Sequence, residues 1–138
     1  IPPPDAFATE DIAGQEFASF EQTMWLLNFV ATGQVVVIDA RHDAVAYEAG
    51  HIPGALRLSA DMFDDLDPAA EEFVINTPVE TRVVIYCGGG ECDESINTRN
   101  RLYDRGFEVY HIFKGGWEEW TAKRGPVATG TDPGEPMP

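Results

Sequence analysis

The sequence predicts an α/β fold in which a mostly parallel β-sheet is covered by helices on both faces. Short apolar runs recur along the chain, and each has the length of a strand. Segments whose apolar residues follow helical spacing separate these runs. The runs are continuous instead of alternating with polar residues, which is typical of strands buried on both faces.

The first half of the chain contains two helical and two strand segments. Ser19 and Gln22 have the form of a capping box, so a helix starts there, and its apolar spacing continues to an end near Gly33. A turn with two glycines and a proline at residues 50–55 separates the second helical segment from the second strand. The expected elements are a helix from 20 to about 33, a strand at 35–39, a helical turn at 44–49 and a strand at 55–58.

The second half repeats this alternation. Gly106 stands where a helix that begins at Ser95 would end, because glycine is common just after a helix C-terminus. The expected elements are a helix within 61–76, a strand at 83–86, a helix at 95–105, a strand at 108–113 and a helix at 117–124.

A length of 138 residues suits one domain with its own core. The proline-rich beginning and the Gly- and Pro-rich end differ from the compact middle. We therefore expect an extended arm at residues 1–14, a single domain at 15–125 and a flexible tail at 126–138.

The net charge of −15 makes nucleic acids and anionic lipid surfaces unsuitable partners. No apolar run approaches the roughly 20 residues that cross a bilayer. The chain begins at Ile1 without a basic segment before an apolar one, so any targeting segment is expected to have been removed or to lie outside it. These features predict a soluble protein and leave its compartment, cytoplasm or periplasm, open.

The strand at 83–86 is followed by Cys87, three glycines and the start of a helix. Glycines let the backbone curl so that successive N–H groups point inward, and such donors beside a helix N-terminus stabilise an anion. We expect an exposed Cys87 sulfur that this loop holds as a thiolate nucleophile. The alternative is a buried cysteine before an ordinary loop.

The second cysteine, Cys92, lies five residues after Cys87 in the same loop. A bridge between the two would join no distant parts of the fold. Cys92 could resolve an oxidised or sulfur-bearing Cys87 by forming a disulfide, or it could be a small side chain packed under the loop. The sequence leaves both alternatives open.

Five stretches, taken in order, resemble the rhodanese-like domain family. They are Val37-Ile38-Asp39-Ala40-Arg41, Tyr47-Glu48-Ala49-Gly50-His51-Ile52-Pro53-Gly54-Ala55, the strand-Cys87-loop-helix segment, Gly106-Phe107-Glu108-Val109-Tyr110 and Gly115-Gly116-Trp117-Glu118-Glu119-Trp120. Each stretch alone is a weak signal, whereas their joint order is specific and covers most of residues 17–125.

This resemblance implies a five-stranded parallel sheet with an active cysteine at Cys87. In that family the thiolate takes the outer sulfur of a donor such as thiosulfate, carries it as a persulfide and passes it to cyanide or a thiol. The family needs no cofactor, and its partners are small sulfur donors or protein persulfides and thiols. The implied site comprises the nucleophile Cys87, the loop residues Gly88, Gly89, Gly90, Glu91, Cys92, Asp93, Glu94 and Ser95, and the supporting residues Asp39, Arg41 and His51.

The loop departs from the family pattern because it contains no Lys or Arg and carries three carboxylates, Glu91, Asp93 and Glu94. Carboxylates near a thiolate raise its pKa and repel thiosulfate, so efficient use of thiosulfate is not expected. An alternative interpretation is that Asp93, Glu94 and Ser95 cap the helix that begins there.

The supporting residues are expected to have structural roles. We expect Arg41 to pair with Glu48, with contact to the substrate as the alternative, and His51 to pack or form hydrogen bonds, with catalysis as the alternative. His42 and His111 lack the spacing from the cysteines that a zinc site needs, so no metal is expected.

The leading hypothesis is a sulfurtransferase or persulfide carrier that uses Cys87 and a donor less anionic than thiosulfate. A dithiol redox module formed by Cys87 and Cys92 and a non-catalytic interaction domain are the alternatives. A phosphatase is not expected, because the loop lacks the Arg that would hold the phosphoryl oxygens.

Overall fold

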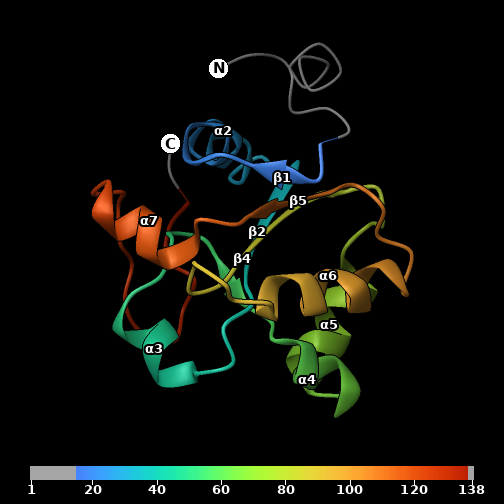
Figure 1. Cartoon of the computed structure of the whole chain (residues 1–138). Helices are drawn as coiled ribbons and strands as arrows, with labels where there is room; N and C mark the ends of the chain where they lie inside the picture. Colours follow the sequence, from blue (N-terminus) through green and yellow to red (C-terminus); the bar gives the residue numbers. More distant parts are fainter. Residues whose placement is uncertain (1–14, 137–138) are drawn as a thin grey trace.

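The computed structural model describes residues 15–136, and in it the chain forms a five-stranded, all-parallel sheet with the strand order β1-β5-β4-β2-β3 (Figure 1). The strands are β1 (Phe17–Ala18), β2 (Val35–Asp39), β3 (Leu56–Arg57), β4 (Arg82–Tyr86) and β5 (Tyr110–Phe113). The predicted α/β class and the five-stranded sheet are therefore confirmed. The arm expected at residues 1–14 lies outside the described residues.

Helices cover both faces of this sheet (Figure 1). They are α2 (Phe20–Leu26), the 3-10 turn η1 (Leu27–Phe29), α3 (Ala44–Ala49), α4 (Ala60–Asp64), α5 (Pro68–Asn76), α6 (Glu94–Tyr103) and α7 (Gly116–Ala122). One core cluster joins α2 and α7 to the sheet, and the other joins α4, α5 and α6 to it. None of the helices between residues 15 and 136 combines the length and apolar character needed to cross a bilayer.

The alternation of side chains along β4 decides which layer the cysteine faces. Val84 and Tyr86 point into the cluster with α2 and α7, whereas Val83, Ile85 and Cys87 point into the cluster with α4, α5 and α6. Since successive residues of a strand face opposite sides, Cys87 continues the strand pattern for one more residue. The cysteine side chain therefore lies on the α4–α6 face of the central strand.

The prediction of a single helix within residues 61–76 is wrong, because two helices, α4 and α5, occupy this segment. Asp67 caps α5 by accepting a hydrogen bond from the N–H of Ala69, and Pro68 is the first residue of α5. Leu66, just before the cap, has a φ of 55°. A proline has no N–H to continue a preceding helix and disfavours helical backbone before it, so α4 ends before α5 begins.

The capping box at Ser19 and Gln22 is confirmed, with the Ser19 hydroxyl accepting from the Gln22 N–H and the Gln22 side chain accepting from the Ser19 N–H. The helix it starts ends at Leu26 and continues only as η1, earlier than the expected end near Gly33. The two-residue strand β1 before it was not expected from the apolar pattern, because two residues are too few to show one.

Residues 126–136, which the sequence assigns to a tail, make specific contacts with the turn after α3. Ala128 and His51 exchange two backbone hydrogen bonds of 2.9 Å each, and the carbonyl of Pro133 accepts a 2.7 Å bond from Gly54. The indole N–H of Trp120 donates to the Pro126 carbonyl at 2.7 Å. This segment therefore packs against the turn predicted at residues 50–55.

Candidate active site

The loop between β4 and α6 carries Cys87, and the N-terminus of α7 holds its first two carbonyl groups. The N–H of Trp117 donates to the Cys87 oxygen at 2.8 Å, and the N–H of Glu118 donates to the Gly88 oxygen at 2.9 Å. A trans peptide directs its N–H opposite to its C=O, so the N–H groups of Gly88 and Gly89 point away from α7. Within residues 15–136 no acceptor contacts these two N–H groups, which leaves them available to an anion.

The loop and α7 approach each other so closely that glycine is required at their contact. A Cβ on Gly116, whose φ is +60°, would lie 2.5 Å from the Cys87 oxygen and 2.7 Å from the Gly89 nitrogen. Any larger residue would push the loop away from the two α7 N–H groups that hold it. The Gly115-Gly116-Trp117 stretch thus fixes the position of the cysteine loop through its backbone.

Cys87 and Cys92 form a disulfide, with their Cα atoms 6.5 Å apart. Cys87 is 3% exposed, and Cys92 is partly exposed. The expectation of an exposed Cys87 sulfur is therefore wrong for this state, because the bond to Cys92 and the packing under α4–α6 cover it. Cys92 was expected either to form a disulfide with Cys87 or to be a small side chain packed under the loop. The structure has the disulfide.

Two oxygen atoms of α6 lie next to the two sulfurs. Ser95 Oγ is 3.6 Å from Cys87 Sγ, and Glu94 Oε1 is 3.3 Å from Cys92 Sγ. A disulfide carries no S–H, so here the Ser95 hydroxyl donates to Cys87, and the Glu94 oxygen only touches Cys92. After reduction, the Cys92 thiol can donate to this carboxylate. The other carboxylate oxygen of Glu94 accepts from the N–H of His42 at 2.8 Å, which fixes its orientation.

The remaining acidic residues of the loop face water. Glu91 and Asp93 are exposed, and Asp93 stands at the N-cap of α6 without a capping hydrogen bond from its side chain. The interpretation of Asp93, Glu94 and Ser95 as side-chain caps is therefore wrong, because Glu94 and Ser95 turn toward His42 and the disulfide. A cavity of about 480 Å³ lies on the Cys92 side of the loop, lined by Gly90, Glu91, Cys92, Asp93, Ser95, Ile96, Ile112 and Lys114.

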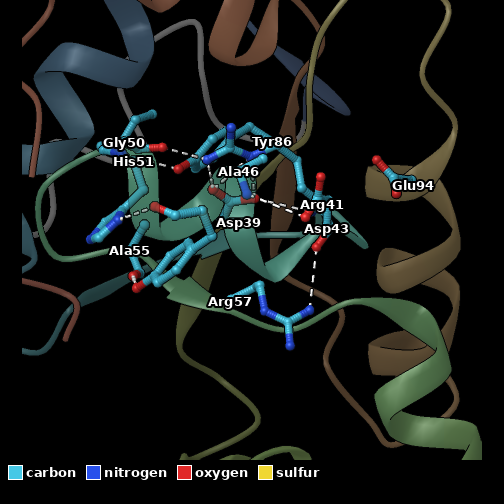
Figure 2. A network of polar contacts seen from close by, with 12 residues as sticks. Asp39, Arg41, Asp43, Ala46, Gly50, His51, Ala55, Arg57, Tyr86 and Glu94 are labelled. Carbon is cyan, nitrogen blue, oxygen red and sulfur yellow. Dashed lines mark hydrogen bonds and ion pairs between the residues drawn. The ribbon is translucent and has the colours of Figure 1, made fainter. Parts of the chain in front are cut away.

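The end of β2 carries a buried ion pair between Asp39 and Arg41 (Figure 2). Arg41 Nη2 lies 2.7 Å from Asp39 Oδ2, Nε contacts both carboxylate oxygens at 3.1 Å, and Nη2 also donates to the Gly50 carbonyl at 2.6 Å. Although burial lowers the pKa of Arg41, hydrogen bonds and charge from Asp39 raise it above its ordinary value overall. The predicted pairing with Glu48 is wrong, because Glu48 is exposed and Asp39 occupies the guanidinium.

Tyr86, the last residue of β4, links this ion pair to the cysteine. Its hydroxyl accepts a 3.0 Å hydrogen bond from the Ile52 N–H, and its backbone oxygen accepts a 2.7 Å bond from Ala40. Burial, together with the charge of Asp39, raises the pKa of Tyr86 well above its ordinary value, so the phenol stays neutral. Tyr86 is not among the site residues predicted from the sequence, although its place directly before Cys87 could have indicated it.

His51 is fully buried in the turn after α3 (Figure 2). Its Nδ1 lies 2.9 Å from the Tyr47 carbonyl and its Nε2 3.1 Å from the Pro133 carbonyl, while the ring stacks on Tyr47 at 3.9 Å between centroids. Both nitrogens are thus occupied by backbone oxygens. His51 holds the turn that supplies the Ile52 N–H to Tyr86, and so it supports the site from behind.

The guanidinium of Arg41 also lies over the Trp117 ring, 5.0 Å from its centroid. This contact joins the β2 end to the first turn of α7, whose backbone binds the cysteine loop. Asp39, Arg41 and Cys87 therefore belong to one connected edge of the sheet, as expected for the carboxyl ends of parallel strands.

One group of side chains has atoms that could ligate a metal. The sulfurs of Cys87 and Cys92 and a carboxylate oxygen of Glu94 lie within 4.8 Å of one another. In this structure the two sulfurs are bonded to each other, so neither is a thiolate ligand.

The sequence profile of the Rhodanese-like domain matches residues 22–123. The thiosulfate sulfurtransferase GlpE of Pseudoalteromonas translucida (strain TAC 125) is 30% identical over 104 residues, covering 75% of this chain and 87% of that protein. The tRNA uridine(34) hydroxylase of Erwinia tasmaniensis is 34% identical over 92 residues, 65% of this chain. The chain spans only 25% of that hydroxylase.

Solved structures share the fold. The Rhodanese-like domain of the Alr3790 protein from Anabaena sp. aligns with a TM-score of 0.58 and 26% identity, over 85% of this chain and 81% of that one. The human single-domain sulfurtransferase TSTD1 aligns with a TM-score of 0.60 and 21% identity, over 80% and 99% of the two chains. At this identity the second likeness concerns the fold alone.

Proposed function

The chain belongs to the rhodanese-like domain family, and we propose that it transfers sulfane sulfur through a persulfide on Cys87, after reduction of the Cys87–Cys92 disulfide. The observation that carries this proposal is the position of Cys87 at the carboxyl end of the central strand β4. There the free N–H groups of Gly88 and Gly89 and the Ser95 hydroxyl can stabilise a sulfur anion.

The first step is an attack of the Cys87 thiolate on the outer sulfur of a persulfide donor, R–S–SH. The Cys87–sulfur bond forms, the S–S bond of the donor breaks, and the donor leaves as the thiolate R–S⁻. A nucleophilic acceptor then attacks the outer sulfur of the persulfide. The bond between this sulfur and Cys87 Sγ breaks, and Cys87 leaves as the thiolate. Neither step requires a net oxidant or reductant.

The charge of the loop selects the kind of donor. Glu91, Asp93 and Glu94 flank Cys92 in the loop, and the loop itself holds no cation. Thiosulfate carries two negative charges, so these carboxylates repel it more than they repel a neutral or singly charged persulfide. We therefore assign a low-molecular-weight or protein persulfide as the donor and a thiol as the acceptor.

The proposal is tested by exposing the reduced Cys92→Ser variant, in which Cys87 is the one remaining thiol, to thiosulfate and, separately, to glutathione persulfide. The expected result is a gain of one sulfur atom on the Cys87 peptide with the persulfide and much less with thiosulfate, measured by mass spectrometry. The Cys87→Ser variant should gain none. Equal transfer activity in Cys87→Ser and in the wild type would refute the assignment of Cys87.

The disulfide also favours a second candidate, a dithiol redox module that exchanges electrons with other thiol proteins. Such a module would cycle between the dithiol and the disulfide without taking up sulfur. Thiol titration after mild oxidation would show reversible loss of both thiols in either case. Absence of a sulfur adduct on Cys87 of the Cys92→Ser variant with every donor would favour this second function.

A further inference from the structure

We infer that Cys92 is a second catalytic residue, which attacks a persulfide on Cys87 and releases its outer sulfur as hydrosulfide, with Glu94 as the base. This inference rests on the proposed persulfide function and adds a different outcome to it, because the sulfur leaves as hydrosulfide instead of moving to an external acceptor. The product left on the protein is the Cys87–Cys92 disulfide.

The geometry decides which sulfur Cys92 attacks. Cys92 Sγ is in bonding contact with Cys87 Sγ, so the native loop already permits the bond that the reaction forms. The backbone supports this closure, because the N–H of Cys92 donates to the Gly89 carbonyl at 3.3 Å and α7 holds the other end of the loop. Cys92 therefore attacks the inner sulfur, Cys87 Sγ, and the outer sulfur is the leaving group.

Glu94 is placed to take the proton of the Cys92 thiol. Its Oε1 lies 3.3 Å from Cys92 Sγ, and its other oxygen is held by the His42 N–H at 2.8 Å. A base must lie within hydrogen-bond reach of the proton it removes, and sulfur bonds are longer than those of oxygen and nitrogen. The hydrogen bond from the His42 backbone N–H keeps the Glu94 carboxylate turned toward the Cys92 sulfur. Without this bond, the carboxylate could rotate into water.

The step balances as follows: Cys87–S–S⁻ and Cys92–SH give Cys87–S–S–Cys92 and HS⁻. The bond between Cys87 Sγ and the outer sulfur breaks, and its electron pair leaves with the outer sulfur. The Cys92 thiolate supplies the pair for the new disulfide bond, and the proton passes through Glu94 to the departing sulfur. The outer sulfur is reduced to sulfide while the Cys92 sulfur is oxidised, and Cys87 Sγ keeps the oxidation level that it had in the persulfide.

The acidic loop suits the release of an anion. Glu91 and Asp93 line the cavity of about 480 Å³ beside Cys92 together with one cation, Lys114, so the net negative charge of the lining favours the release of hydrosulfide into solvent. The carboxylates that disfavour a dianionic donor thus also favour the expulsion of hydrosulfide. An external dithiol reduces the disulfide and restores both cysteines.

The test is a single turnover, in which the reduced protein receives less than one equivalent of glutathione persulfide without other reductant. In the wild type we expect one hydrosulfide and one disulfide for each donor consumed. Cys92→Ser should keep the sulfur as a persulfide on the Cys87 peptide and release no hydrosulfide. This variant thus separates loading from release.

Glu94→Gln tests the base, because glutamine can still accept the His42 hydrogen bond but takes no proton. We expect hydrosulfide release to slow by about 100-fold with normal loading of Cys87. The loss should shrink as the pH rises through the ordinary range of thiol ionisation near about 8.5, where the thiolate forms without a base. Glu72→Gln, an exposed change on α5, is the matched control and should release hydrosulfide at the wild-type rate.

The outcomes separate this inference from the proposed function. A persulfide that forms on Cys87 and persists in the wild type, or a sulfur atom found on the Cys92 peptide, would overturn the resolving role and leave sulfur transfer intact. Failure of Cys92→Ser to load any sulfur would instead count against the proposed function. A Glu94→Gln variant that is slow to the same degree at every pH would exclude Glu94 as the base.

Discussion

Arg41 folds back onto Asp39, two residues earlier in the chain, and forms an ion pair with it at 2.7 Å. Arg41 is 7% exposed and Asp39 is 0% exposed. Nη2, which pairs with Asp39, also donates to the Gly50 carbonyl, and the guanidinium lies over the Trp117 ring. One buried cation thus connects the end of β2, the turn after α3 and the first turn of α7. These are the elements against which the Cys87 loop is built.

Removing one charge of this pair should destabilise the fold strongly. Asp39→Asn leaves the Arg41 guanidinium buried without a counter-charge, so we expect a loss of about 3–5 kcal/mol in the free energy of unfolding. Urea denaturation of the variant and the wild type measures this loss in the free energy of unfolding. The double variant Asp39→Asn with Arg41→Met removes the stranded charge and should recover part of the loss. Equal losses in the single and double variants would show that the charge is not the cause.

The contact between α7 and the cysteine loop should tolerate no side chain. Gly116→Ala places a methyl group against the Cys87 oxygen at a φ of +60°, so we expect a loss of about 2 kcal/mol or more and poor sulfur loading of Cys87. Gly33→Ala is the matched control, because Gly33 has a φ of +81° and open space around it. Urea denaturation and the loading assay compare the two. Equal effects would mean that backbone strain alone, and not the clash, matters.

Alkaline pH should unfold the protein through two buried tyrosines. Burial raises the pKa of Tyr47 to about 12 and that of Tyr86 well above its ordinary value. Unfolded tyrosines lose their protons from about pH 10, where the folded ones keep them, so stability is full below about pH 10 and falls as the pH rises toward about 12. The slope reaches about 1.4 kcal/mol per pH unit for each such tyrosine.

Urea midpoints measured between about pH 9 and about pH 12 check this slope. Tyr47→Phe should make the alkaline decline shallower, although it also loses the hydrogen bond from the Tyr47 hydroxyl to the Ala55 carbonyl. Tyr103→Phe, an exposed change with 52% of the residue accessible, should keep the wild-type slope. An unchanged slope in Tyr47→Phe would contradict the assignment.

Reduction of the disulfide should begin at Cys92. Cys87 is 3% exposed whereas Cys92 is partly exposed, so an attacking thiolate reaches the Cys92 sulfur first and Cys87 leaves as the thiolate. A dithiol reductase whose second cysteine has been replaced should be trapped as a mixed disulfide on the Cys92 peptide. Trapping on the Cys87 peptide instead would show that the loop opens before the attack.

Much of the fold follows from local patterns. The strand at 35–39, the helical turn at 44–49 and the Ser19 capping box are confirmed because each depends on residues adjacent in sequence. The break at Leu66–Asp67 was readable in principle, since Pro68 cannot follow a continuous helix. The edge strand β1 exists only through its pairing with β5, and no run of two residues can reveal such a pairing.

The candidate site was predictable in its residues but not in its contacts. The Cys87 loop and the Asp39-Arg41 pair could be located because the apolar runs show where the strands end. The partner of Arg41 was misjudged, because burial decides between Asp39 and Glu48, and local spacing alone does not report burial. The disulfide and the turn of Glu94 toward Cys92 depend on how the loop closes, which three glycines leave undetermined in sequence.

The bridge between Ala128 and His51 has a practical consequence for anyone who cuts this polypeptide. A truncation after residue 125 would strip the Pro133 oxygen from the His51 imidazole and the Pro126 oxygen from the Trp120 indole. The buried Trp120 N–H would then face water or go unsatisfied, at a cost of about 1–3 kcal/mol, and the His51 ring would lose one of its two polar partners. Expression clones should therefore run through Pro133, and a shorter product that aggregates would say nothing about the chemistry of its cysteines.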